Sequence, residues 1–245
     1  EAINDSLKIS NGGMVLIAEN GLENVYGEFS AYLRSSENVT FIASKDARFK
    51  KVQIGYHAGQ DGSLAAKTDS TLTVKGFNVS GDLYISAADQ RVVAEGNTAG
   101  SITVKTHHID NMDIRISDNV LTGGADAFKY GVYIVPNTTN YSLTVNGNSF
   151  SGIKSHAIGI QGSGDGSAVT EAKTITVKGN NFISYGLGSA AFKIWADQKL
   201  APSSSTTANS AARELAEAVK ANNSFSEGVK KDCILANFYD AKVAF

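Results

Sequence analysis

The densest group of side chains that could carry out chemistry lies between residues 107 and 115. His107, His108, Asp110, Asp113 and Arg115 bring imidazole, carboxylate and guanidinium groups together in one short segment. Such groups can exchange protons with a substrate, and carboxylates can also bind a divalent cation. These five residues are therefore the predicted catalytic residues, if the chain is an enzyme.

Motifs for metals and cofactors are weaker. His57 and His156 have no partner at the spacing of a zinc site, so no metal centre is predicted. Segments 59–62 and 162–166 resemble calcium-binding turns rich in glycine and aspartate, but the repeated nonapeptide that defines such sites is missing. No cofactor is predicted, with calcium at these turns as the one alternative.

Composition excludes several classes of protein. The 245 residues are 42% hydrophobic with a net charge of −2, which allows a large core and gives no general attraction to nucleic acid. No apolar stretch reaches the ~20 residues of a membrane span. Cys233 is the only cysteine, so no intrachain disulfide can form, and its apolar surroundings predict a buried, inert thiol. The 24 glycines against 2 prolines indicate many tight turns.

An internal repeat must position these residues. Its pattern is apolar-x-apolar-x-x-Asn-x-apolar, which indicates a short strand with one buried face, a turn, and a return to the core. Stacked copies would let the asparagines form a hydrogen-bonded ladder. The copies are 72–79, 102–109, 114–121, 143–150 and 175–182, with a looser one at 219–225. The copies at 102 and 114 are too close for both to begin full coils, so one of them lies on a different side of the same coil.

A second short strand follows most copies, at 83–85, 132–134, 158–160 and 192–194. Two strands per coil, each pairing with its counterpart in the next coil, predict a solenoid. A β-sandwich or a β-propeller is the competing architecture, but neither requires the same asparagine at equivalent corners.

These repeated strand and asparagine-turn segments resemble the pectate-lyase-like (pectin lyase-like) right-handed parallel β-helix superfamily. The resemblance covers residues 70–195 well and the first 70 residues poorly. It implies an all-β, single-stranded right-handed parallel β-helix, and enzymes of this architecture often cleave acidic polysaccharides. The chain lacks the adjacent aspartates and the Gly-His-Gly of the hydrolases. His107 also falls at the asparagine position of the repeat, where a structural role would explain it.

Outward-facing positions supply a second set of candidates. In the second strands these are Tyr84, Tyr133 and Lys193, with Trp195 beyond them, and they would suit sugar stacking unless the helix or a loop covers them. In the first strands the outward residues form a polar, mildly basic strip, which is either ordinary solvated surface or a track for an acidic glycan. That strip is Thr73, Thr103, Arg115, Thr144 and Thr176, then Lys75, Lys105, Ser117, Asn146 and Lys178.

The chain is interpreted as one β-helix domain, 1–245, with irregular coils or a cap over 1–70, regular coils over 71–195, and a C-terminal cap over 196–245. One short α-helix is predicted near residues 210–220, inserted before a last strand, because Ala, Leu, Glu and Arg favour helix and Ser210 can cap it. Leu215 and Val219 lie four residues apart and would dock on the solenoid.

Three functions follow from this interpretation. The favoured one is a secreted, cell-surface or periplasmic bacterial protein that binds a polysaccharide or a cell-surface glycan without catalysis. The second is a polysaccharide lyase or glycoside hydrolase acting on an acidic polysaccharide through the residues at 107–115, which rests on analogy of fold. The third is a structural spacer within an adhesin or fibre.

Overall fold

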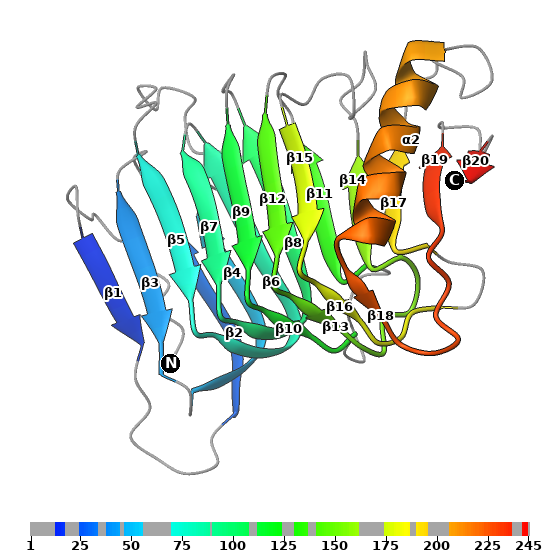
Figure 1. Ribbon diagram of the computed structural model, residues 1–245. Helices are drawn as coiled ribbons and strands as arrows, with labels where there is room; N and C mark the ends of the chain where they lie inside the picture. Colours follow the sequence, from blue (N-terminus) through cyan, green and yellow to red (C-terminus); the bar gives the residue numbers. More distant parts are fainter. Residues whose placement is uncertain are drawn as a thin grey trace.

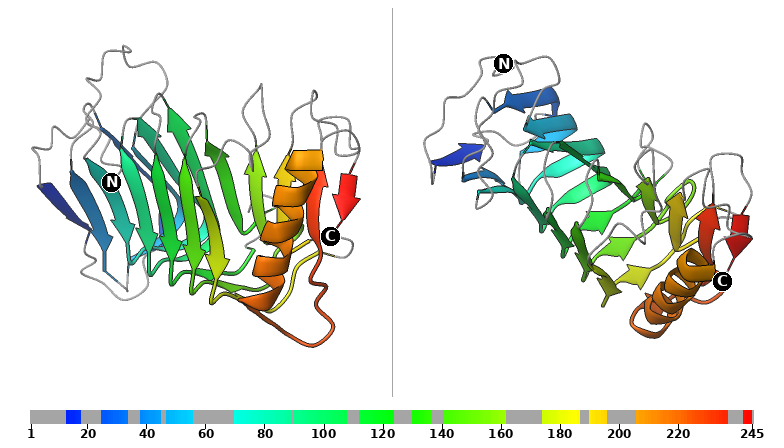
Figure 2. Two further views of the ribbon diagram at one scale, coloured as in Figure 1. Left: turned by 45° about the horizontal axis from the view of Figure 1, so that its top comes forward. Right: turned by 90° about the horizontal axis from the view of Figure 1, so that it is seen from above.

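A computed structural model shows a stack of parallel strands that grows along one axis from the N-terminal to the C-terminal end (Figure 1). It describes residues 13–17, 25–33, 38–44, 47–55, 70–88, 90–107, 112–123, 130–136, 141–161, 174–186, 190–195, 206–236 and 242–244. The chain passes around the stack so that each turn adds one rung to every face, as the view from above shows (Figure 2).

The first face is a parallel sheet of short strands in the order β1-β3-β5-β7-β9-β12-β15. The five strands from β3 to β12 in this order alternate buried and more exposed residues, as expected for a sheet with one face in the core. The strands are β1 (Gly13–Ile17), β3 (Val39–Ala43), β5 (Thr71–Lys75), β7 (Arg91–Glu95), β9 (Asp113–Ser117), β12 (Ser142–Asn146) and β15 (Thr174–Lys178).

The other strands form a second sheet that bends around a corner. β6 (Asn78–Ala88) and β8 (Thr98–His107) run through this corner, so their first residues belong to a second face and the rest to a third face. Two-residue strands continue the second face: β10 (Val120–Leu121), β13 (Ser149–Phe150), β16 (Asn181–Phe182) and β18 (Ser224–Phe225). The third face contains β2 (Val25–Tyr32), β4 (Arg48–Gly55), β6 (Asn78–Ala88), β8 (Thr98–His107), β11 (Val132–Pro136), β14 (Ile158–Gln161), β17 (Phe192–Trp195) and β19 (Cys233–Ala236).

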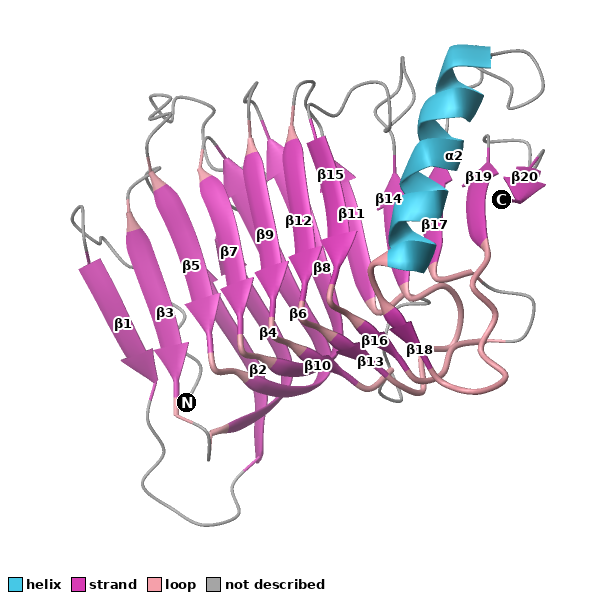
Figure 3. Cartoon of the chain, viewed as in Figure 1, coloured by secondary structure: helices cyan, strands magenta, loops and turns pink. Residues whose placement is uncertain are grey.

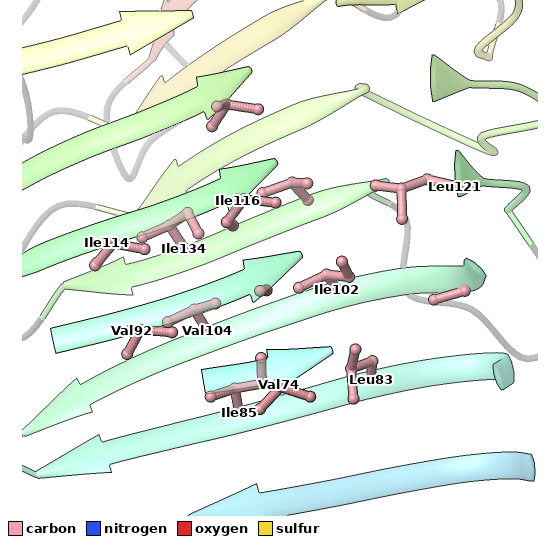
Figure 4. Packing of buried hydrophobic residues seen from close by; sticks show 14 of the residues in the cluster. Val74, Leu83, Ile85, Val92, Ile102, Val104, Ile114, Ile116, Leu121 and Ile134 are labelled. Carbon is pink, nitrogen blue, oxygen red and sulfur yellow. The ribbon is translucent and has the colours of Figure 1, made fainter. Parts of the chain in front are cut away.

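Aliphatic side chains from the first and third faces fill the space between them (Figure 4). Leu83, Ile85, Ile102 and Val104 from the third face meet residues such as Ile114 from the first, and all are completely buried. This continuous core runs along the stack. The strands of both sheets are parallel almost throughout, as Figure 3 shows. The prediction of an all-β parallel β-helix with one short helix is confirmed.

A ladder of buried asparagines follows the corner after the first face. The amide Nδ2 of each asparagine donates a hydrogen bond to the Oδ1 of the next, at 2.9, 2.8, 3.0 and 2.8 Å. The rungs are Asn97, Asn119, Asn148, Asn180 and Asn223. The residue before each of the first four has a positive φ and is glycine except for Asp118, whose φ is 56°. The predicted ladder is thus present.

At its N-terminal end a phenylalanine takes the place of the ladder asparagine, and toward its C-terminal end stacked phenylalanines lie beside the ladder. Phe77 occupies the asparagine position one coil before Asn97, and its backbone N–H donates to Asn97 Oδ1 at 2.9 Å. Toward the other end, Phe182 is stacked between Phe150 and Phe225, with ring centroids 5.1 and 4.9 Å apart. The corner is therefore held by hydrogen bonds in the middle coils and partly by aromatic packing at the flanks.

The helix α2 (Thr206–Ala221) stands beyond β15 in the row of first-face strands (Figure 1). Its Val219 is fully buried and Leu215 packs against the core, as predicted. Asn223, just after the helix, donates from Nδ2 to the Val219 carbonyl at 2.7 Å and so joins the helix end to the ladder. The helix thus takes the place of a first-face strand in the last coil. Antiparallel β20 (Lys242–Ala244) follows beside β19.

Coils before residue 70 were expected to be irregular. On the first face, β1, β3 and β5 pair in continuous parallel register, and on the third face β2 and β4 pair along most of their length. A register shift comes where β4 pairs with β6, between Phe49 and Val52, and the extra residue there belongs to β6. No helix in the described part of the chain is long and apolar enough to cross a membrane.

The prediction that one of the copies at 102 and 114 lies on a different side of the coil is confirmed, but the alignment of the copy at 102 with the first strands is wrong. Residues 102–107 belong to β8 on the third face, where Ile102 pairs with Leu83 and Val132, and the end of that copy lies outside the described residues. The first-face copy in that coil is β7, and Asn97 fills its asparagine position. His107 is therefore not in the asparagine position, so the repeat does not explain that residue.

Candidate functional site

The outer side of the third face brings the predicted sugar-binding residues into one row. Strand register places Gln53, Tyr84, Thr103, Tyr133, Gly159 and Lys193 next to one another on successive coils. Tyr84, Tyr133 and Lys193 are each partly exposed. Trp195 lies two residues further along β17, opposite Gln161, and its side chain falls outside the described residues.

Tyr130, just before β11, adds a second ring to this row. Its ring is stacked on Tyr133, with centroids 5.2 Å apart and an interplanar angle of 14°, and on His156 at 5.7 Å. Gly159 makes room for it, because a Cβ there would come within 2.8 Å of the Tyr130 ring. The Tyr130 ring therefore covers the gap that Gly159 leaves between Tyr133 and Lys193.

Hydrogen bonds fix the orientation of this aromatic group. The Tyr133 hydroxyl donates to Gln161 Oε1. His156 is buried, and its Nδ1 accepts a hydrogen bond from the Ala190 N–H at 2.8 Å. Burial raises the pKa of the Tyr130 and Tyr133 phenols, so both remain protonated at neutral pH. The platform is thus flat and apolar on the rings, with neutral polar tips.

A buried carboxyl lies beside the row. Asp82 is on the outer side of β6, two residues before Tyr84, and only 7% exposed. Its Oδ1 accepts hydrogen bonds from Ser101 Oγ at 2.8 Å and from Thr103 Oγ1 at 3.1 Å. A register shift between Val79 and Asp82 turns β6 at this corner. Gly81 is required in the turn, because a Cβ there would lie 2.5 Å from the Lys50 carbonyl oxygen.

Asp82 has a strongly perturbed acidity. Burial raises its pKa from 3.8 to about 6, against the opposing hydrogen bonds from Ser101 and Thr103 and the positive charge of Lys51. Burial and the charge of Asp82 together raise the pKa of Tyr84. A carboxyl that titrates near neutral pH, on the outside of a sheet and next to tyrosines, marks a candidate functional position.

The predicted catalytic residues are only partly described. Asp113 and Arg115 lie on the outer side of the first face, where they form an ion pair with N–O distances of 2.8 and 2.9 Å. His107 is the last residue of β8, with its side chain outside the described residues, and His108 and Asp110 lie outside them altogether. Among the described side chains of this set, Asp113 and Arg115 are brought together.

The polar strip of the first face also needs correction. Val93 and Glu95 occupy the positions assigned to Thr103 and Lys105, which belong to the third face. Glu95 forms an exposed ion pair with Lys75 at 3.2 Å. The strip is therefore less basic than predicted, and the argument for an acidic glycan on this face is weaker.

Nothing in the described part of the chain gathers three or more metal-binding side chains. The predicted calcium turns, 59–62 and 162–166, lie outside the described residues.

Comparison of the chain with protein-family models, with curated proteins and with solved structures finds no match.

Sequence reasoning found the row of Tyr84, Tyr133 and Lys193 but missed Tyr130, His156 and Asp82 as parts of the site. Tyr130 precedes its strand and reaches the row only because glycine stands on the next coil at position 159. The sequence does contain a signal for Asp82, which is an acid immediately before the inward Leu83. Later coils carry small neutral residues at the position of Asp82, namely Ser101, Gly131, Ala157 and Ala191.

Proposed function

We propose that the chain binds a carbohydrate on the outer side of the third face, without cleaving it. The observation that carries this proposal is the row in which Tyr84 and Tyr133 lie two coils apart, on either side of Thr103, extended by the stacked ring of Tyr130. The flat C–H faces of sugar rings pack well on such aromatic surfaces, while phenol, hydroxyl and ammonium groups meet the sugar hydroxyls.

The helix does not cover this row. α2 packs beside β15 and β19, whereas Tyr84 lies on β6 and Tyr133 on β11, and both remain partly exposed. Because the coils repeat at about 4.8 Å, an extended polymer could contact several of them at once. A long polysaccharide or a cell-surface glycan is therefore the proposed partner, and a secreted, surface or periplasmic location of a bacterial protein is proposed with it.

Tyr133→Ala is expected to weaken binding of a polysaccharide about tenfold, because about 1.4 kcal/mol of stacking is lost. Tyr133→Phe keeps the ring and removes the hydroxyl that donates to Gln161, so its affinity should stay close to that of the wild type. The measurement is affinity electrophoresis against a panel of soluble polysaccharides, followed by calorimetry with the best one.

Ile183→Ala is the matched control, since Ile183 is 40% exposed and follows β16 on the second face. Binding that is equally strong in wild type and Tyr133→Ala would contradict the proposed surface. A wild-type chain that binds no polysaccharide in the panel would contradict the function itself.

Cleavage of an acidic polysaccharide is the second candidate, and Asp82 is the observation that favours it. A carboxyl with a pKa of about 6 can give or take a proton near neutral pH. An assay for reducing ends and for unsaturated products on polyuronates tests this candidate. Activity in the wild type that disappears in Asp82→Asn would support it, and no product from any polyuronate would rule it out.

A further inference from the structure

We propose that Asp82 is a ligand contact that determines specificity, its ionised Oδ2 accepting a hydrogen bond from a hydroxyl of a neutral sugar unit held against Tyr84. This inference rests on the proposed carbohydrate-binding function and names the polar contact of the same site.

The hydrogen bonds of Asp82 leave one oxygen available. Both hydroxyl donors, Ser101 and Thr103, reach Oδ1. Oδ2 therefore has no donor among the described residues. A carboxylate oxygen without a donor is a strong acceptor, and hydrogen bonds to a charged acceptor are worth more than neutral ones. Sugar hydroxyls are donors of this kind.

Later coils show which residues the repeat carries at the position of Asp82. The same outward position in later coils is occupied by Ser101, Gly131, Ala157 and Ala191. All of these are small and uncharged, and the strands next to them pair in the same parallel register. The fold thus accepts a neutral residue at this position, and this coil carries a buried acid that opposes stability. A buried acid that lowers stability, at a position where later coils carry small neutral residues, points to a role in function.

Charged and titratable groups surround Asp82 on both sides of β6. Lys51 on β4 and Glu28 on β2 pair in register on the preceding coils and are exposed. Lys105 lies on β8 on the following side, and Tyr84 and Tyr133 are the phenols of the row. Next to Asp82, Lys51 and Lys105 balance Glu28 and Asp82 in formal charge, and Lys193 of the row lies four coils away. The surroundings of Asp82 therefore favour an uncharged, hydroxyl-rich ligand over a strongly charged one.

Asp82→Asn provides the test, because the amide keeps an Oδ1 acceptor for both hydroxyls and replaces Oδ2 with a donor. Affinity for soluble galactomannan, xyloglucan and mixed-linkage β-glucan would be measured at pH 4.5 and pH 7.5. These probes carry no titrating group. Wild type should bind its best glycan about tenfold more tightly at pH 7.5, where Asp82 is ionised, and Asp82→Asn should lose this difference. Glu95→Gln, on the first face, should behave as wild type.

The outcomes separate this inference from the proposed function. Suppose that wild type binds and that Tyr133→Ala weakens binding. If Asp82→Asn then matches wild type at both pH values, the proposed role of Asp82 is wrong, and the proposed binding surface is retained. Tighter binding at pH 4.5 than at pH 7.5 would also overturn it, because a protonated Asp82 would then be the contact. If wild type binds only polyuronates, the neutral ligand class is wrong. No binding by wild type to any glycan would overturn both.

Discussion

Asn148→Ala is expected to lower the free energy of unfolding by about 3–5 kcal/mol, since several buried polar groups lose their partners at about 1–3 kcal/mol each. Asn148 is 1% exposed and sits in the middle of the ladder. Its Oδ1 accepts from both the backbone N–H and the Nδ2 of Asn119. Its Nδ2 donates to the Ile116 carbonyl at 2.9 Å and to Asn180 Oδ1 at 3.0 Å.

The loss would be large because no other group can take over these bonds. Alanine offers neither donor nor acceptor, and the corner is too tightly packed on its inner side to admit solvent freely. Chemical denaturation gives the free energy of unfolding and its denaturant dependence. Asn146→Ala is the matched control: its side chain points outward from the first face, and the Asn146 carbonyl that accepts from Asn148 is retained.

The control should change stability by less than about 0.5 kcal/mol. Equal effects of the two substitutions would contradict the account of the ladder, because then neither depth nor hydrogen bonding would distinguish the inner from the outer asparagine.

Asp82→Asn is expected to stabilise the fold at neutral pH and to make little difference in acid. The folded-state pKa of about 6 lies above the 3.8 of an exposed aspartate. Protonated Asp82 therefore contributes stability that is fully present below about pH 3.8 and is lost as the pH rises through about 6. The difference between these two pKa values corresponds to about 3 kcal/mol in the free energy of unfolding, at 1.36 kcal/mol per pH unit.

The quantity to measure is the difference in unfolding free energy between Asp82→Asn and wild type, from pH 3.5 to pH 7.5. This difference should rise by about 3 kcal/mol across the range, because other titrating groups contribute equally to both proteins. A difference that stays constant with pH would show that the carboxyl is not buried in the folded state. Glu95→Gln, in an exposed ion pair, should show no comparable trend.

Much of the fold could be predicted because the repeat combines two strong signals. Alternating apolar residues identify strands, and a recurring asparagine identifies the corner, as Asn119, Asn148 and Asn180 show. The copy at 92–99 carries the same pattern, Val92-Val-Ala94-Glu-Gly-Asn97-Thr-Ala99, but its inward residues are small, which weakens the apolar signal there. The asparagine after glycine is the stronger signal in that copy, and it places Ile102 beyond the corner, on the third face.

The candidate site was less predictable for a physical reason. Strand alternation is local, so it identified Tyr84 and Tyr133 as outward residues. The position of Tyr130 depends on the missing side chain at Gly159, a coil away, and the acidity of Asp82 depends on burial beside Ser101 and Thr103. Such features arise when coils stack, and a single coil read alone does not contain them.

The most direct test of the central claim is a titration of isotope-labelled protein with an oligosaccharide cut from the best-binding polysaccharide, followed by amide chemical shifts in NMR spectra. We expect the shifted signals to belong to the third face, centred on Tyr84, Thr103, Tyr133 and Lys193, and we expect Tyr133→Ala to reduce these shifts. Shifts confined to the first face, to the second face around Ile183 or to α2 would contradict binding on the third face.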